Sequence, residues 1–447
     1  MTEREKEIIG LIHREVKPAL GCTEPIAVAL AVAKAVEIME ERCPVCRIGD
    51  WRLCAAFEVE VAVSGNILKN GMGVGIPGTG MVGLHIAAAL GAVCGRSEYG
   101  LEVLEDLDER AIARAKALVE EKKIKVTLAD TEHKLYVKAA VRVDSKCTES
   151  SAHNATAVIE DDHDNIVETY FDDKMLSDLH NEGAFKNEAG NGTDPTLTVK
   201  EIFEFADKTD FENIAFILDS RKLNLALSEE GLHGDYGLRV GKTIYCRSHK
   251  DIFGDDLMSY AMALTAAASD ARMAGCTLPA MSNSGSGNQG ITATMPVIAF
   301  ALRNGIDDRR IVRALTLSHL VAIHIKSYLG KLSALCGCVV ASTGSSCGIC
   351  YLMGGGYGEI CSCIKNMIGN ITGMVCDGAK TGCAMKVASG VSGAVQSAVL
   401  AMDGVCISSN DGIIEDNIEK TIHNLGRIGS VGMTGTDEMI LDIMVCK

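Results

Sequence analysis

From residue 196 onward, this chain consists of stretches in which apolar residues recur at helical spacing, separated by short glycine-rich segments. The apolar-periodic stretches predict helices at 197–229, 252–275, 289–304, 308–328 and 385–402. The glycine-rich segments predict loops at 282–290, 337–348, 354–358 and 373–382. Helix ends that meet such loops direct several backbone N–H groups at one centre. The pattern therefore predicts a mostly helical domain whose loops gather around a site.

The N-terminal part combines helices with strands. Helical spacing predicts helices at 4–15 and 26–41, and the second follows a Pro/Gly break and is capped by Thr23 or Glu24. Alternating apolar residues predict strands at 56–64, 123–129, 134–143, 155–161 and 165–171. Two further helices are predicted at 81–94 and 107–121. The glycine-rich run Gly71–Gly80 predicts a turn-rich hairpin, and the acidic segment 160–195 predicts loops or a lid.

These patterns together predict an α+β protein with a mostly helical catalytic domain and a smaller α+β domain. The helical domain is expected to be discontinuous, from residues 1–48 and 196–447, and to carry the glycine-rich loops. The α+β domain is expected to cover residues 49–195 and to pack over the site. In this arrangement Cys22, near the N-terminus, must approach glycine-rich loops that carry the C-terminal cysteines at the far end of the chain.

Composition limits the partners and the compartment of the chain. Its 447 residues carry a net charge of −16 and no Lys/Arg-rich tail, which argues against nucleic-acid binding. The N-terminus lacks a signal-peptide pattern, and no run of 18 apolar residues is free of charged or helix-breaking residues. We therefore expect a cytoplasmic protein with no membrane partner and a small-molecule substrate. A homodimer is compatible with an enzyme of this size.

Three of the 18 cysteines lie in two glycine-rich segments near the C-terminus, Cys336 in the first and Cys376 and Cys383 in the second. In the expected compartment, cysteines are thiols or metal ligands more often than disulfides. No pair of the three has the CxxC spacing of a structural zinc site, and the CxxC at Cys43 and Cys46 lacks a suitable second pair. Three thiolates from separated loops suit an iron–sulfur cluster with one iron left open. An open iron is a Lewis acid, so such a cluster can act as a catalyst.

Two other motifs carry candidate chemistry. Cys22 begins a predicted helix, where the helix dipole favours a thiolate, so it is a candidate base, nucleophile or ligand; otherwise it is a small buried residue. The segment Met281–Gly290 is rich in Ser, Asn and Gly, which suits the carboxylate of a small substrate as well as a simple interhelical loop. It lacks the Gly-Lys-Ser/Thr of a Walker A loop. Lys17 is a candidate Schiff-base lysine for pyridoxal phosphate, but no phosphate loop accompanies it.

Four motifs together resemble the iron–sulfur L-cysteine desulfidase family, a serine dehydratase-like, UPF0597-type family. They are Lys17-Pro-Ala-Leu-Gly-Cys-Thr-Glu-Pro25, Ser282-Asn-Ser-Gly-Ser-Gly-Asn-Gln-Gly290, Lys331-Leu-Ser-Ala-Leu-Cys-Gly-Cys338 and Cys376-Asp-Gly-Ala-Lys-Thr-Gly-Cys383. The resemblance covers nearly the whole chain, with the motifs in matching order. More distantly, the C-terminal half is similar to the α-domain of bacterial iron–sulfur L-serine dehydratases.

The resemblance implies an oxygen-sensitive 4Fe-4S cluster held by three cysteines, Cys336, Cys376 and Cys383, with Cys338 as the alternative to Cys336. It also implies that L-cysteine is converted to pyruvate, ammonia and hydrogen sulfide by β-elimination. Cys22 matches the active-site cysteine of the family, and we expect it to act as the base, with its pKa lowered by the helix N-terminus and by Lys17. The substrate is expected to contact the polar side chains of Asn283, Ser284, Ser286 and Asn288.

Two alternatives share the same cysteines. An iron–sulfur L-serine or L-threonine dehydratase performs the same elimination with water as the leaving group, so the sequence separates it poorly from a desulfidase. A non-catalytic iron–sulfur or redox-sensing protein is also consistent with many thiols. A sensor has no need of the Ser/Asn/Gly segment, because it binds no small substrate.

Overall fold

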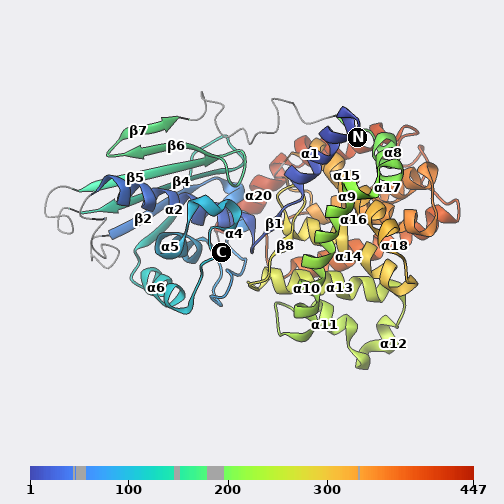
Figure 1. The fold of residues 1–447 in the computed structure, drawn as a ribbon, viewed down its shortest axis with the longest axis horizontal. Coiled ribbons are helices and arrows are strands. Elements are labelled where there is room, and N and C mark those ends of the chain that lie inside the picture. The colour runs from blue at the N-terminus through green and yellow to red at the C-terminus, as the bar shows by residue number, and fades with distance from the viewer. Residues whose placement is uncertain (44–45, 47–56, 145–151, 179–195, 331–332, 447) are drawn as a thin grey trace.

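The computed structural model describes residues 1–43, 46, 57–144, 152–178, 196–330 and 333–446, and these form two parts that lie side by side (Figure 1). One part contains a six-stranded sheet with the strand order β3-β2-β4-β5-β6-β7. β2 and β3 are parallel, and the other neighbours are antiparallel. The strands are β2 Phe57–Val63, β3 Ile124–Leu128, β4 Tyr136–Val143, β5 His153–Glu160, β6 Ile166–Phe171 and β7 Lys174–Asp178. The mostly helical α+β class and the five predicted strands are confirmed.

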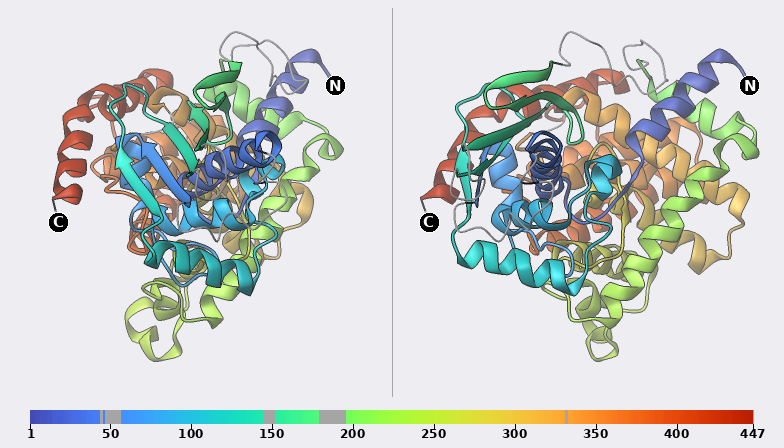
Figure 2. Two further views of the ribbon diagram at one scale, coloured as in Figure 1. Left: turned by 90° about the vertical axis from the view of Figure 1, so that its left-hand side faces the viewer. Right: turned by 60° about the vertical axis from the view of Figure 1, so that its left-hand side comes forward.

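Helix α2 (Thr23–Arg42) packs with the sheet and with helix α5 (Leu84–Cys94). The sheet curves around α2, which is seen nearly end-on in the right-hand view of Figure 2. A Cβ atom on Gly91 would lie 2.3 Å from the carbonyl oxygen of Ala29, so the two helices are in close contact. The prediction grouped residues 23–42 with the C-terminal helices. Their apolar, Ala- and Val-rich surface is instead buried in the core of the sheet part.

Further helices also lie near the sheet. They are α4 Gly65–Gly71 and α6 Glu109–Glu120, with a 3-10 turn at Ser97–Glu102. The C-terminal helix α20 (Thr434–Val445) returns to this part and contacts α4, where Lys69 forms an ion pair with Asp437. The predicted acidic loop region begins with the turn between β5 and β6 and continues into β6 and β7. Residues 179–195 of that prediction lie outside the described residues.

The second part is an assembly of helices that includes the predicted helical stretches. The first helix, α1, covers Glu3–Glu15 and is capped by Thr2. The others are α8 Val199–Lys208, α9 Phe211–Ile214, α10 Leu218–His233, α11 Val240–Tyr245, α12 Lys250–Phe253, α13 Leu257–Met273, α14 Gly287–Asn304, α15 Asp308–Leu329, α16 Gly337–Met353, α17 Tyr357–Ile371, α18 Cys383–Met402 and α19 Ile418–Arg427. The predicted helix at 197–229 is divided, because α8 ends at Lys208 and two short helical turns precede α10.

Helix α16 corrects the prediction of a glycine-rich loop at 337–348. It packs against α14, α15, α17 and α18, and nearly all of its residues are buried. Its small residues permit close helix contacts: a Cβ atom on Gly344 would lie 2.3 Å from the carbonyl oxygen of Ser318. The glycines and serines of this segment therefore serve helix packing.

Helix α18 is, among the described residues, the one helix long and apolar enough to cross a membrane by length and composition. Its most apolar window is 56% buried within the protein. It packs against α13, α16 and α17, so its apolar side chains contribute to the core of the helical part.

A short two-stranded ladder joins the N-terminal segment to the helical part. β1 (Pro18–Ala19) pairs antiparallel with β8 (Ala280–Met281). Because β1 leads into α2 and β8 leads into the Ser/Asn/Gly segment, this ladder brings Cys22 and the loop at 282–286 to the same place. The approach of the N-terminal segment to the glycine-rich loops is therefore confirmed for this loop.

Gly290, in the first turn of α14, is expected to be essential for this junction. A Cβ atom there would lie 2.0 Å from the carbonyl oxygen of Met281. Overpacking against backbone is costly, so we expect Gly290→Ala to lower the free energy of unfolding by about 2 kcal/mol or more. Thermal unfolding followed by circular dichroism measures this.

Gly358→Ala in the first turn of α17 is the matched control, because no heavy atom lies within 4 Å of its added Cβ. This substitution is expected to leave stability unchanged or to raise it by about 0.5–1 kcal/mol. Equal unfolding temperatures for the Gly290→Ala and Gly358→Ala variants would contradict the close contact at Gly290.

Candidate active site

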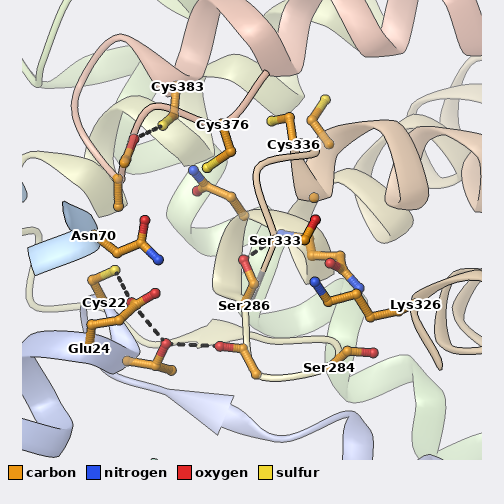
Figure 3. Close-up of a pocket in the computed structure, with 18 of the residues that line it drawn as sticks. Cys22, Glu24, Asn70, Ser284, Ser286, Lys326, Ser333, Cys336, Cys376 and Cys383 are labelled. Atoms are coloured by element: carbon orange, nitrogen blue, oxygen red, sulfur yellow. Dashed lines mark hydrogen bonds between the residues drawn. The ribbon is translucent and has the colours of Figure 1, made fainter. Parts of the chain in front are cut away.

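A cavity of about 120 Å³ lies where the two parts meet, and Figure 3 shows it in close-up. From the sheet part it is lined by Cys22, Thr23, Glu24, Asn70 and His163. From the helical part it is lined by the three cysteines predicted as metal ligands and by polar residues of the loop before α14. The cysteines occupy one end and Cys22 with Glu24 lies across the cavity from them (Figure 3).

Backbone pairing brings two of the cysteines together. The segments before Cys336 and Cys376 form an antiparallel bridge at Leu335 and Val375. The amide of Cys336 donates to the Met374 carbonyl at 3.0 Å, and the amide of Cys376 donates to the Ala334 carbonyl at 2.6 Å. Cys383, the third member, is the first residue of α18.

Burial raises the pKa of Cys336 to about 12, and the neighbouring Cys376 and Cys383 thiols add to this by charge repulsion. The pKa of Cys383 is raised for the same reasons, burial first and Cys376 second. Thiols such as Cys336 and Cys383, whose ionisation is disfavoured, are stabilised as thiolates by a bound cation. The three predicted ligands therefore lie together at one cavity.

Cys338, the alternative first ligand, is turned toward a helix. Its thiol donates a hydrogen bond to the Lys386 carbonyl in α18 at 3.2 Å. A Cβ atom on Gly390 of α18 would lie 2.5 Å from its sulfur. Cys338 touches the cavity wall, but its thiol is held between α16 and α18, which favours Cys336 as the ligand.

Cys336, Cys376 and Cys383 present three thiols to one cavity. Within the described ranges, no three His, Cys, Asp or Glu side chains converge closely enough to hold one metal ion. A four-iron cluster spreads its thiolate ligands over several irons, and three ligands around one cavity leave one iron accessible. The loop between the last two ligands is braced by ion pairs of Asp377 with Lys380 and Lys386. Cysteine thiols are the donors by which iron–sulfur clusters are held, so this donor chemistry is compatible with the predicted ligands.

Cys22 is paired with a carboxylate. It is the N-cap of α2, where Thr23 or Glu24 was predicted, and its side chain makes no capping bond. Its thiol instead donates to Glu24 Oε2 at 3.0 Å (Figure 3). The Thr23 hydroxyl, which donates to the Gly285 carbonyl at 2.8 Å, ties this turn to the loop before α14.

The predicted lowering of the Cys22 pKa is wrong for this structure. Burial and the negative charge of Glu24 raise its pKa, and these outweigh the opposing charge of Arg272. Burial also acts to raise the pKa of Glu24, but the charge of His163 and the hydrogen bond from Cys22 hold it below its usual range. The pair therefore holds a protonated thiol beside an ionised carboxylate.

The predicted lysine, Lys17, is not among the residues that line the cavity. Its backbone carbonyl accepts hydrogen bonds from the Ser282 amide at 2.8 Å and from the Ser282 hydroxyl at 2.7 Å. These bonds extend the β1–β8 ladder into the Ser/Asn/Gly segment. A catalytic role for its side chain stays a prediction.

Three of the four predicted substrate-binding residues, Ser284, Ser286 and Asn288, line the cavity. The loop turns sharply there, because Ser284 and Gly285 have φ angles of 48° and 76°. The fourth, Asn283, is fully buried and lies behind the wall. Its side chain donates to Nδ1 of His319 at 3.0 Å and to the His319 carbonyl at 3.2 Å.

This buried network fixes the orientation of Gln289. Burial lowers the pKa of His319 to about 3, so its ring is neutral. With Nδ1 accepting from Asn283, the ring proton lies on Nε2 and is donated to the Thr294 hydroxyl at 3.1 Å. Asn283 Oδ1 accepts from the Gln289 amide at 2.9 Å. The other amide atom of Gln289, Oε1, is left at the cavity wall as an acceptor without a partner.

Several polar residues of the cavity wall were not predicted from the sequence. Four buried atoms that line the cavity have no hydrogen-bond partner among the described residues: Asn70 Oδ1, His163 Nε2, Arg272 Nε and Gln289 Oε1. Buried polar atoms normally have partners, so their gathering here indicates a site built for a polar ligand. His163 lies in the acidic β5–β6 turn and Arg272 near the end of α13, where no local motif distinguishes them. Gln289 belonged to a quoted motif but was not selected.

Comparison with known proteins agrees with these motifs. The model of the serine dehydratase alpha chain matches residues 98–442. The UPF0597 protein of Bacteroides thetaiotaomicron is 49% identical, over 100% of this chain and 99% of that protein. The UPF0597 proteins of Phocaeicola vulgatus and Oleidesulfovibrio alaskensis are 48% and 49% identical, over 100% and 98% of this chain and 98% and 97% of those proteins. The chain therefore belongs to the UPF0597 family, a serine dehydratase-like family.

Proposed function

We propose that this protein is an L-cysteine desulfidase, a carbon–sulfur lyase that does not use pyridoxal phosphate. It would eliminate hydrogen sulfide from L-cysteine to give 2-aminoacrylate, which reacts with water to give pyruvate and ammonia. The observation that carries the proposal is the single cavity that joins three cluster-type cysteines, the Cys22–Glu24 pair and the Ser/Asn loop. Membership of a serine dehydratase-like family supports the broader class of lyase.

Cys336, Cys376 and Cys383 would hold a 4Fe-4S cluster. When bound, such a cluster supplies an open Lewis-acidic iron that can polarise a carboxylate or a leaving sulfur. The chain itself supplies the surroundings. The walls bury the reacting groups, and Ser284, Ser286 and Asn288 offer hydrogen bonds to a small substrate.

The Cys22–Glu24 pair is the proposed proton acceptor. The two side chains share one proton across the 3.0 Å hydrogen bond. As the thiol gives that proton to Glu24, the sulfur takes the Cα proton of the substrate, and the Cβ–S bond breaks. The departing sulfide then carries away one of these protons and restores the pair. A thiol with a raised pKa can act as a base here because a carboxylate receives its proton.

A second candidate is an L-serine or L-threonine dehydratase, in which water leaves instead of sulfide. The specific observation in its favour is the match to the serine dehydratase alpha chain over residues 98–442. The same proton acceptor would serve both reactions.

Assays on protein purified without oxygen test this proposal. Sulfide and pyruvate are measured with L-cysteine, and pyruvate or 2-oxobutyrate with L-serine or L-threonine. The desulfidase predicts equal amounts of sulfide and pyruvate from L-cysteine. If the protein forms pyruvate from L-serine but releases no sulfide from L-cysteine, the dehydratase replaces the desulfidase as the proposed function. No turnover of any of the three by protein with its full iron content would contradict both.

A further inference from the structure

Lys326, near the C-terminus of α15, is a cation at the cavity wall that the proposed mechanism does not use. Figure 3 shows it on the same side of the cavity as Ser284, Ser286 and Ser333. No hydrogen bond or ion pair of its ammonium is found among the described residues. Burial lowers its pKa to about 8, and the nearby Cys376 and Cys336 thiols oppose this shift. An ammonium without a counter-ion at the edge of a cavity is a binding group for an anion.

Arg272, another basic residue of the cavity wall, is already engaged. One terminal nitrogen of Arg272 donates to Asn288 Oδ1 at 3.3 Å and contacts Met273. Its positive charge acts on the pKa values of both Cys22 and Glu24. Arg272 is therefore held by a hydrogen bond, whereas the Lys326 ammonium has no hydrogen bond or ion pair within the part of the chain that the structure describes.

The two sides of the cavity consequently differ in charge. Lys326 lies on the side where Ser286 caps the N-terminus of α14, and a helix N-terminus favours negative charge. Glu24, across the cavity, repels a carboxylate and attracts an ammonium. A zwitterionic amino acid is accommodated in one orientation, with its carboxylate toward Lys326 and its ammonium toward Glu24.

We infer that Lys326 binds the α-carboxylate of the amino-acid substrate and thereby sets its orientation between the cluster cysteines and the Cys22–Glu24 pair. This inference rests on the proposed function for the class of substrate. It makes Lys326 a substrate-binding residue that selects α-amino acids over amines without a carboxylate.

A matched pair of inhibitors tests the inference on the iron-loaded protein. 3-Mercaptopropionate has the thiol and the carboxylate of cysteine but no amine, and cysteamine has the thiol and the amine but no carboxylate. Dissociation constants are measured by calorimetry without oxygen for the wild-type protein and for Lys326→Met. If Lys326 forms a charge-assisted hydrogen bond with the carboxylate, Lys326→Met should raise the dissociation constant of 3-mercaptopropionate about 10- to 100-fold. The dissociation constant of cysteamine should stay within about twofold of the wild-type value.

Lys134→Met is the control variant. Lys134 is an exposed lysine whose charge reaches Lys326 but which does not line the cavity. It should leave both dissociation constants unchanged. Lys326→Arg, which keeps the charge, should recover most of the affinity for 3-mercaptopropionate.

The inference would be overturned if Lys326→Met raised the dissociation constants of both inhibitors equally, or raised neither. If Lys326→Met loses iron, Lys326→Gln and Lys326→Arg replace it, and equal carboxylate affinity in those two variants would also overturn it. Binding is measured apart from turnover. A protein that binds 3-mercaptopropionate through Lys326 but releases no sulfide from L-cysteine would therefore reject the desulfidase and keep the role of Lys326.

Discussion

Replacing Cys376 or Cys383 by alanine is expected to remove the cluster and to lower elimination activity by about 10³-fold or more. The thiols of Cys336, Cys376 and Cys383 line one cavity, and the first two are held side by side by backbone hydrogen bonds. Loss of one of three protein ligands leaves a cluster with two, which is too few to retain it. Iron and acid-labile sulfide, together with the visible absorption of the anaerobic protein, measure the loss.

Cys338→Ala is the discriminating control for this prediction. Its thiol is bonded to the Lys386 carbonyl between α16 and α18, so this variant is expected to keep its iron, with some loss of stability. Cys336→Ala should lose the iron. A Cys338→Ala protein without iron beside a Cys336→Ala protein with full iron would reverse the assignment of the first ligand.

Replacing Cys22 by alanine is expected to keep the cluster and to lower turnover by about 10²- to 10⁴-fold, the usual contribution of a general base. Cys22 lies across the cavity from the cluster cysteines, and its thiol is bonded to Glu24. Glu24→Gln should have a similar effect, because an amide cannot receive the proton of the thiol. The measurements are kcat for sulfide release and the iron content of the same samples.

Cys43→Ala provides a matched cysteine control, because Cys43 is buried at the other end of α2. It should keep both iron and turnover in any sample that remains folded. A Cys22→Ala protein with turnover within about twofold of wild type would remove Cys22 from the mechanism. Loss of iron in Cys22→Ala would instead make Cys22 a ligand.

Much of the fold follows from local pattern. The strands at 57–63 and 136–143 alternate apolar and polar residues, and the helix at 3–15 has a capping box, so each is visible within its own segment. Helix α16 could not be recognised in this way. Its glycines and serines are typical of loops in isolation, and they are helical because α14, α15, α17 and α18 surround them.

The site was predictable where motifs carry it. Cys22, Ser284, Ser286, Asn288 and the three C-terminal cysteines line one cavity although they come from distant parts of the sequence. Asn283 could not be separated from its neighbours, because only the tertiary structure places His319 beside it. Lys326 and Arg272 lie on apolar helices without a motif, so their roles depend on which helices meet.

The protonation state of Cys22 likewise could not be predicted from local sequence. A helix N-terminus lowers a thiol pKa by a modest amount at an exposed site. Here complete burial and the adjacent carboxylate of Glu24 dominate and raise it. Glu24 is two residues away in the sequence, but its hydrogen bond to the thiol depends on the backbone turn at Cys22.

The most direct test of the central claim is a single experiment on protein purified without oxygen. Iron and acid-labile sulfide are quantified, and the same sample is given L-cysteine while sulfide and pyruvate are followed. The account predicts about four irons per chain, as in a 4Fe-4S cluster, with sulfide and pyruvate released in equal amounts. A folded protein that takes up no iron after reconstitution and releases no sulfide would contradict it, and its C-terminal cysteines would then be ordinary core residues.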